Sequence, residues 1–107
     1  MAKNLAGMRN YQFIEELWAR ESPRKREIRL ETILGRATQD DGHLMLRPTM
    51  AISRSGVRAL IGTKRMVWIL LYGESPNREV VSACGNAGCA HPDHLTLGRE
   101  IRGRIDG

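Results

Sequence analysis

Two cysteines and a histidine recur at equal spacing near the C-terminal end of this 107-residue chain. Four residues separate Cys84 from Cys89, and four more separate Cys89 from His94. Thiolate sulfur and imidazole nitrogen are ligands that zinc prefers, and a loop that runs into a helix brings such spacing onto one ion. Pro92 suits the first turn of such a helix, where its missing N–H costs nothing. The pattern predicts a structural Zn²⁺ site; two unrelated buried thiols or a Cys84–Cys89 disulfide are the alternatives.

The residues around this pattern form two longer motifs. One reads Ser82-Ala-Cys84, followed by Cys89-Ala-His-Pro-Asp-His94-Leu-Thr-Leu-Gly98, and the other reads Thr63-Lys-Arg-Met-Val-Trp-Ile-Leu-Leu-Tyr-Gly-Glu-Ser-Pro76. They resemble motifs of the His-Me finger (HNH, ββα-metal) endonucleases, in particular the zinc-containing phage and homing-type group. The resemblance covers residues 63–98 and extends faintly to Gly35 and Asp41-Gly42. It implies an α+β fold, a small zinc-stabilised ββα-metal core with an N-terminal helix and a β-hairpin.

Two catalytic positions of that family carry other residues here. The resemblance implies a general-base histidine where this chain has Ser82, and a magnesium-binding asparagine where it has Gly103. A serine hydroxyl does not titrate near neutrality and cannot accept a proton as imidazole does. Glycine offers a metal no side-chain oxygen. The resemblance therefore implies a scaffold that has kept its zinc and lost its nuclease reaction, so we expect no enzyme.

The fourth zinc ligand stays open in the sequence. The family's fourth ligand, commonly a cysteine, would fall near Leu30, and this chain has only two cysteines. His43, His91 or an acidic side chain such as Glu31 could complete the tetrahedron. His91 stands where the family has a helix-capping asparagine, so capping or a surface contact is its expected role. We expect His43 to be a turn residue or a phosphate contact rather than a ligand.

Positive charge is unevenly distributed along a chain whose net charge is +5. Residues 47–65 contain no acidic side chain, whereas residues 20–29 carry five bases against two glutamates. Clustered arginine without acids is typical of contact with a phosphate backbone, although charge runs also serve solubility alone. A third cluster, Arg99, Arg102 and Arg104, lies near the C-terminal end. The predicted DNA-binding residues are Arg47, Arg54, Arg58, Lys64 and Arg65.

Apolar periodicity predicts one domain, residues 1–107, in three parts. Residues 1–26 would form an N-terminal helix over 11–20 and a basic arm. Residues 27–62 would form strands, with a loosely alternating stretch over 27–34 and a hairpin around residues 53–56. Residues 63–107 would form a helix over 65–72 ended by Gly73, a strand at Val80-Val81, the zinc knuckle and a second helix opened by His94. Phe13 and Trp18 are expected in the core or against a partner.

Two functions of different classes compete. The first is a non-catalytic protein that binds double-stranded DNA with a sequence preference. It would be a phage-type transcriptional regulator or an architectural factor, and a homodimer is possible. The second is a metal-dependent nicking endonuclease with a relocated base such as His43 or His91. A weaker alternative is an inhibitor that binds a protein partner through the N-terminal helix. No apolar run approaches the roughly 20 residues that span a bilayer, so we expect no membrane partner and a location in the host cytoplasm or nucleoid.

Overall fold

The fold is built from paired strands arranged around a central helix. A computed structural model describes residues 14–54 and 56–101, without the side chains of Arg54 and Val57. Residues 14–19 are helical. The elements that follow are α2 (Pro23–Leu34), β1 (Thr38–Asp40), β2 (His43–Met45), β3 (Thr49–Arg54), β4 (Val57–Gly62), α3 (Thr63–Tyr72), β5 (Arg78–Ser82), the short 3-10 helix η1 (Pro92–His94) and β6 (Leu95–Glu100).

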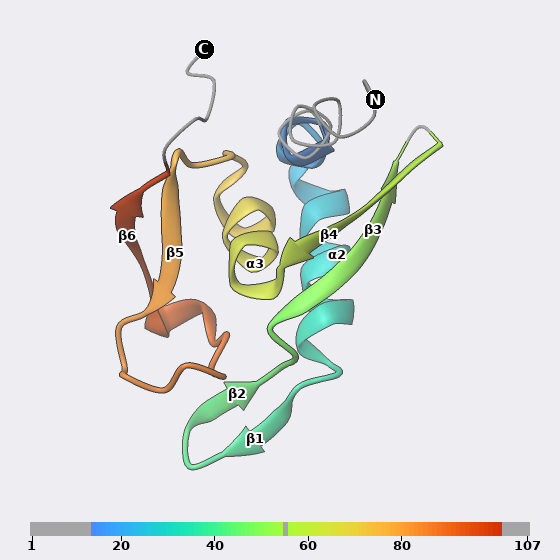
Figure 1. Cartoon of the computed structure of the whole chain (residues 1–107). Helices are drawn as coiled ribbons and strands as arrows, with labels where there is room; N and C mark the ends of the chain where they lie inside the picture. The colour runs from blue at the N-terminus through green and yellow to red at the C-terminus, as the bar shows by residue number, and fades with distance from the viewer. Residues whose placement is uncertain (1–13, 55, 102–107) are drawn as a thin grey trace.

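The strands of the described residues form three separate antiparallel hairpins, β1–β2, β3–β4 and β5–β6. Figure 1 shows α3 between the β3–β4 and β5–β6 hairpins, with the β1–β2 hairpin below them. The molecule is thus a small α+β protein, as predicted. No helix of the described residues is long and apolar enough to cross a membrane.

Helix α3 forms the centre of the core. Met66, Val67, Ile69 and Leu70 are buried, and α3 packs against α2, β4 and β5. The helix ends at Gly73, which adopts the left-handed conformation at φ 69° and donates its N–H to the Ile69 carbonyl. Glycine takes this conformation without the steric penalty of a Cβ atom. The predicted helix, its C-cap and its core stripe are therefore confirmed.

The N-terminal helix contributes its apolar face to the same core. Ile14 and Trp18 are buried among the residues around α3, and the Arg29 guanidinium lies over the Trp18 ring, 3.8 Å from its centroid. Burial of this face favours the core interpretation of Trp18 over contact with a partner. Phe13 and the remaining residues of the predicted helix before Ile14 lie outside the described part of the chain.

The loosely alternating stretch predicted over 27–34 is a helix, so that prediction was wrong. Ser22 caps α2 by accepting a hydrogen bond from the Lys25 N–H, and Pro23 occupies the first turn. Both residues are typical of a helix start. The core contacts come from Leu30, Ile33 and Leu34, whose spacing is helical, whereas Ile28 stays exposed. The strands of the middle segment begin only at Thr38.

The second helix predicted from His94 was also wrong. After the single turn of η1, residues 95–100 form β6, which pairs with β5 through Ser82–Leu95, Val81–Thr96 and Val80–Leu97. Leu95 is buried, Thr96 is exposed and Leu97 is half-buried, so the stretch follows the alternation of a strand rather than helical spacing. Residues 102–107, which include Gly103, Arg104 and Ile105, lie outside the described part.

Candidate metal centre

Backbone hydrogen bonds hold the loop between β5 and η1 in a compact conformation. The N–H of Ala83 donates to the His94 carbonyl at 2.6 Å, and the N–H of Cys89 donates to the Asn86 carbonyl at 3.0 Å. Gly85 turns the chain at φ 80°. Cys84, Cys89 and His94 are consequently brought to one side of this loop.

A long-range pairing adds the β1–β2 hairpin to this loop. Met45 forms an isolated antiparallel bridge with Cys89. On either side of it, the Leu46 N–H donates to the Gly88 carbonyl at 3.2 Å, and the Ala90 N–H donates to the Leu44 carbonyl at 2.8 Å. This pairing places His43, the first residue of β2, beside the two cysteines.

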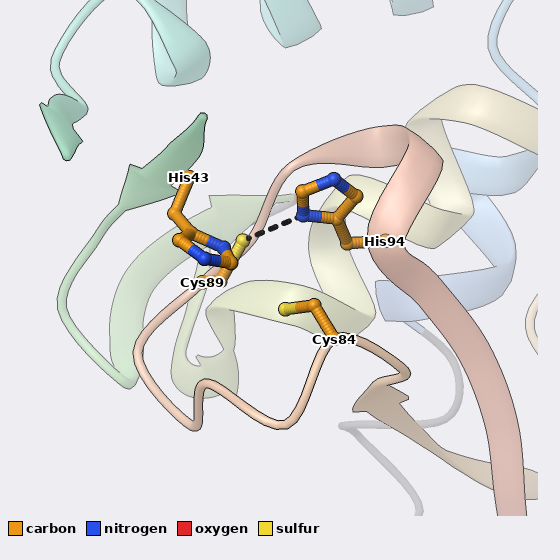
Figure 2. Close-up of side chains that lie close together, drawn as sticks. All are labelled: His43, Cys84, Cys89 and His94. Atoms are coloured by element: carbon orange, nitrogen blue, oxygen red, sulfur yellow. Dashed lines mark hydrogen bonds between the residues drawn. The ribbon is translucent and has the colours of Figure 1, made fainter. Parts of the chain in front are cut away.

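Four potential ligands meet at this point: His43, Cys84, Cys89 and His94. One ligand atom from each lies within 4.8 Å of all the others. The Cys89 Sγ and His94 Nδ1 atoms are 3.4 Å apart, and Figure 2 shows the four side chains converging on a common centre. Tetrahedral zinc with its usual bond lengths sets its ligand atoms roughly 3.3–3.8 Å apart. The His₂Cys₂ cluster could therefore hold a metal ion such as zinc with only small side-chain adjustments.

The chemistry of the donor set fits such an ion. Burial acts to raise the pKa of the Cys89 thiol, but hydrogen bonds from the His91 backbone, from the His94 and His43 rings and from the Leu44 backbone lower that pKa from 9.0 to about 6. The lowered pKa of Cys89 favours its thiolate, the form that binds metals. The Nδ1 atom of His43 is buried and has no hydrogen-bond partner among the described residues. A metal ion at the centre would satisfy both groups.

The structure decides between the alternatives for these residues. Both cysteines are free and Cys84 is exposed, so neither the disulfide nor the pair of buried thiols is correct. His43 was expected to be a turn residue or phosphate contact; the structure instead places it in β2, among the four side chains that could hold a metal ion. Its position just after the Asp41-Gly42 turn gave no local sign of the pairing that brings it to the cysteines.

The other candidates for the fourth ligand lie outside the cluster of the described residues. His91 caps η1, since its Nδ1 atom accepts a hydrogen bond from the Asp93 N–H at 3.0 Å, and its ring stacks on His94. Its expected capping role is confirmed. Glu31 is exposed on α2 and is not among the four grouped residues. His43 is therefore the residue whose position completes the set.

Ser82 has a structural role at the position where the resemblance implies a general base. Its hydroxyl donates a hydrogen bond to the Cys89 carbonyl at 2.8 Å and so ties the end of β5 to the loop. A hydroxyl in this arrangement supports the geometry of the cluster.

The predicted DNA-binding residues separate into two groups. Arg47 and Arg58 are exposed and Lys64 is half-buried. Arg54 pairs with Val57 at the end of the β3–β4 hairpin, and its side chain lies outside the described part of the structure. These positions leave the first three cations on or near the surface around β3 and β4.

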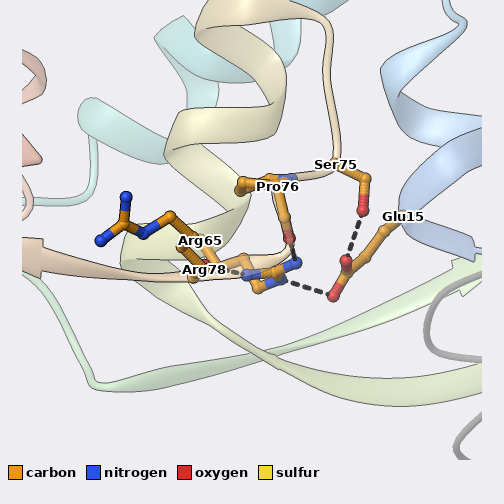
Figure 3. Close-up of polar contacts among 5 residues, drawn as sticks. All are labelled: Glu15, Arg65, Ser75, Pro76 and Arg78. Carbon is orange, nitrogen blue, oxygen red and sulfur yellow. Dashed lines mark hydrogen bonds and ion pairs between the residues drawn. The ribbon is translucent and has the colours of Figure 1, made fainter. Parts of the chain in front are cut away.

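Arg65 belongs to an internal ion pair, so its assignment to the DNA surface is corrected. Its Nε atom lies 2.8 Å from Glu15, and the two side chains are only 12% and 6% exposed. The same guanidinium donates to the backbone carbonyls of Arg78 and Pro76, while the Ser75 hydroxyl donates to the other Glu15 oxygen at 2.7 Å (Figure 3). Arg65 joins the N-terminal helix to the segment before β5.

No protein-family model, curated protein or solved structure matches this chain. The described residues offer a possible metal centre of two histidines and two cysteines, and exposed arginines at positions 47 and 58.

Proposed function

We propose that this chain is a non-catalytic, sequence-preferring DNA-binding protein on an HNH-like core held together by one structural zinc ion. One observation carries the DNA-binding part. The chain has no acidic residue between Asp41 and Glu74, and this stretch contains the β3–β4 hairpin, with exposed Arg58 on β4 and exposed Arg47 just before β3. A surface with cations and no carboxylates attracts a phosphate backbone. A phage-type transcriptional regulator or an architectural factor would use such a surface.

The geometry of the hairpin supports this proposal. In an antiparallel pair, directly opposed residues share a face. Ile52 and Ala59 are one such pair, and Ile52 is buried against the core; Ser53 and Arg58, the next pair, are both exposed. One face of the hairpin is therefore anchored in the core while the other is open to a duplex.

The zinc part rests on the four converging ligands. In a chain of this size, a structural metal adds materially to the stability of a modest core. The ion would be held by His43, Cys84, Cys89 and His94, and it would join β2 to the β5–β6 hairpin. Four protein ligands complete a tetrahedron and leave no open position for a substrate, which is typical of structural rather than catalytic zinc.

The absence of nuclease chemistry is supported by the roles of the residues that could supply a base. Ser82 bonds the loop carbonyl of Cys89, His43 faces the metal centre, and His91 caps η1. A relocated histidine base would have to leave one of these roles. The nicking endonuclease therefore remains the alternative function, and cleavage assays decide between the two.

We predict that the zinc-loaded protein leaves supercoiled plasmid intact in the presence of Mg²⁺ or Mn²⁺. A general base contributes on the order of 10²–10⁴-fold to the rate, and Ser82 cannot supply one. The measurement is an agarose nicking assay at protein concentrations that shift the same DNA in a gel. Robust nicking that disappears in His91→Ala would establish the endonuclease instead.

We predict that Arg58→Ala weakens DNA binding and makes it less dependent on salt. Each lost phosphate contact reduces the magnitude of the slope of log K against log salt by about 0.9. Fluorescence anisotropy with a labelled duplex over a salt series measures both quantities. Arg24→Ala is the matched control, because Arg24 is an exposed arginine on α2 paired with Glu27. Equal affinity and slope in Arg58→Ala and wild type would remove the hairpin from the DNA interface.

A further inference from the structure

The outer edge of β3 carries backbone groups that face no partner strand. Within the described residues, β3 pairs with β4 alone. The Thr63 N–H donates to the Pro48 carbonyl at 2.9 Å, which marks a hydrogen-bonded position at the start of this pairing. Such positions alternate along an antiparallel pair, and Ala51 and Ser53 are each an odd number of residues from Pro48. Their N–H and C=O groups therefore turn away from β4, and neither residue makes a backbone hydrogen bond to another described element.

A groove of about 710 Å³ runs along this edge, between β3 and α2. Residues 50–53 of β3 all line it, whereas none of the β4 residues that the structure describes does so. Successive strand residues point to opposite faces, so a groove that contacts all four lies along the edge of the strand rather than on one face. In Figure 1, β3 crosses in front of α2, which packs chiefly on α3. The free edge of β3 is thus one wall of an open groove.

The other wall of the groove is basic and partly apolar. Its described residues include three cations, Lys25, Arg29 and Arg36, and one acid, Glu21. All three cations are exposed. Ile28 lies in the same wall and is 47% exposed, although its side chain is large and hydrophobic. An excess of positive charge beside exposed apolar surface fits a partner that carries both carboxylates and apolar side chains.

We propose that this groove binds an acidic, extended peptide segment of a partner protein, which adds a strand at the free edge of β3. Donors and acceptors alternate along such an edge and match another extended backbone. A phosphate backbone offers only acceptors, so it would leave the Ala51 and Ser53 carbonyls unpaired. A second copy of this chain would bring the same excess of cations to the edge, which the repulsion of like charges disfavours. The peptide's carboxylates face the cations of the wall, and its apolar side chains cover Ile28.

The first test uses the zinc-loaded protein and a fluorescently labelled peptide of alternating valine and glutamate. Fluorescence anisotropy should show saturable binding, whereas the same peptide with lysine in place of glutamate should not bind. Ala51→Pro should weaken binding by about tenfold or more, because proline removes the outward N–H and its ring obstructs an added strand. Leu60→Pro is the matched control, since Leu60 lies opposite Ala51 and its N–H faces the other edge of the hairpin. A glutamate peptide that does not bind, or that binds wild type and Ala51→Pro equally, would overturn the proposal.

The charge of the basic wall has a test of its own. Arg36→Gln should weaken binding of the glutamate peptide several-fold and reduce its dependence on salt, because it removes one of the cations that face the carboxylates. Arg24→Gln is the matched control, since Arg24 is an exposed arginine on α2 that is not among the described lining residues. Equal affinity and equal salt dependence in wild type and Arg36→Gln would overturn the acidic chemistry of the proposed partner.

Amide hydrogen exchange tests the strand pairing in the wild-type protein, so its result does not depend on how the variants fold. The glutamate peptide should slow exchange at the Ala51 and Ser53 amides and leave the Leu60 amide, on the opposite edge, unchanged. Peptide binding without this protection would exclude strand addition at β3. Protection by a DNA duplex but not by the peptide would assign the groove to DNA, and protection that rises with protein concentration alone would assign it to a second copy. Either result overturns the peptide assignment.

Discussion

Replacing Cys89 with serine is expected to abolish zinc binding and, with it, cooperative folding of the domain. Cys89 is fully buried and contacts His94 within the cluster. The binding free energy of structural zinc in small zinc-dependent domains is about 10–16 kcal/mol. The free energy of unfolding of a typical domain is about 5–15 kcal/mol, which is of similar size. Elemental analysis should find about one zinc per wild-type chain and none in the variant. Circular dichroism should show a sharp thermal transition only for the wild type.

The neighbouring histidines provide the controls for this experiment. His43→Ala removes a proposed ligand and should release zinc, whereas His91→Asn should retain it, because an asparagine oxygen can accept the Asp93 N–H in place of the ring nitrogen. Chelation of wild-type zinc should unfold the protein reversibly. Wild-type protein that is well folded without any metal would contradict the zinc proposal and remove most of the support for an HNH-like core.

Replacing Arg65 with alanine is expected to destabilise the zinc-loaded protein by about 3–5 kcal/mol, because it removes the buried cation that forms an ion pair with the Glu15 carboxylate. It also removes the donors that hold the backbone carbonyls of Pro76 and Arg78. Urea unfolding with saturating zinc measures the change. Lys64→Ala is the matched control, because Lys64 is the half-buried cation next to Arg65 in the sequence. We expect its free energy of unfolding to change by no more than about 0.5 kcal/mol.

A double-mutant cycle tests whether Glu15 and Arg65 act as a pair. Glu15→Ala alone should also be strongly destabilising, and the double variant should be less destabilised than the sum of the two single variants, since each single variant already removes the ion pair between them. An Arg65→Ala variant with wild-type stability and weakened DNA binding would instead return Arg65 to the surface proposed from the charge pattern.

Features defined by nearby residues were predictable from the sequence. The stripe of Met66, Ile69 and Leu70 with Gly73 after it specifies α3, because helical spacing and a left-handed C-cap are local properties. The spacing of Cys84, Cys89 and His94 likewise indicated a shared metal, since one short loop carries all three. The pattern of apolar residues was less informative over 27–34, predicted as a strand, and over 95–100, predicted as a helix. The few apolar residues in each segment fit either structure.

Only the tertiary structure decided which distant residues complete these local features. His43 joins the cluster through the pairing of Met45 with Cys89, and neither segment carries a local signal for that contact. Arg65 lies in a run of cations that looks like surface, yet Glu15, 50 residues earlier, makes it part of an internal ion pair. Spacing along the chain determines local geometry, whereas burial and ligand sets depend on contacts that form only when separate elements pack together.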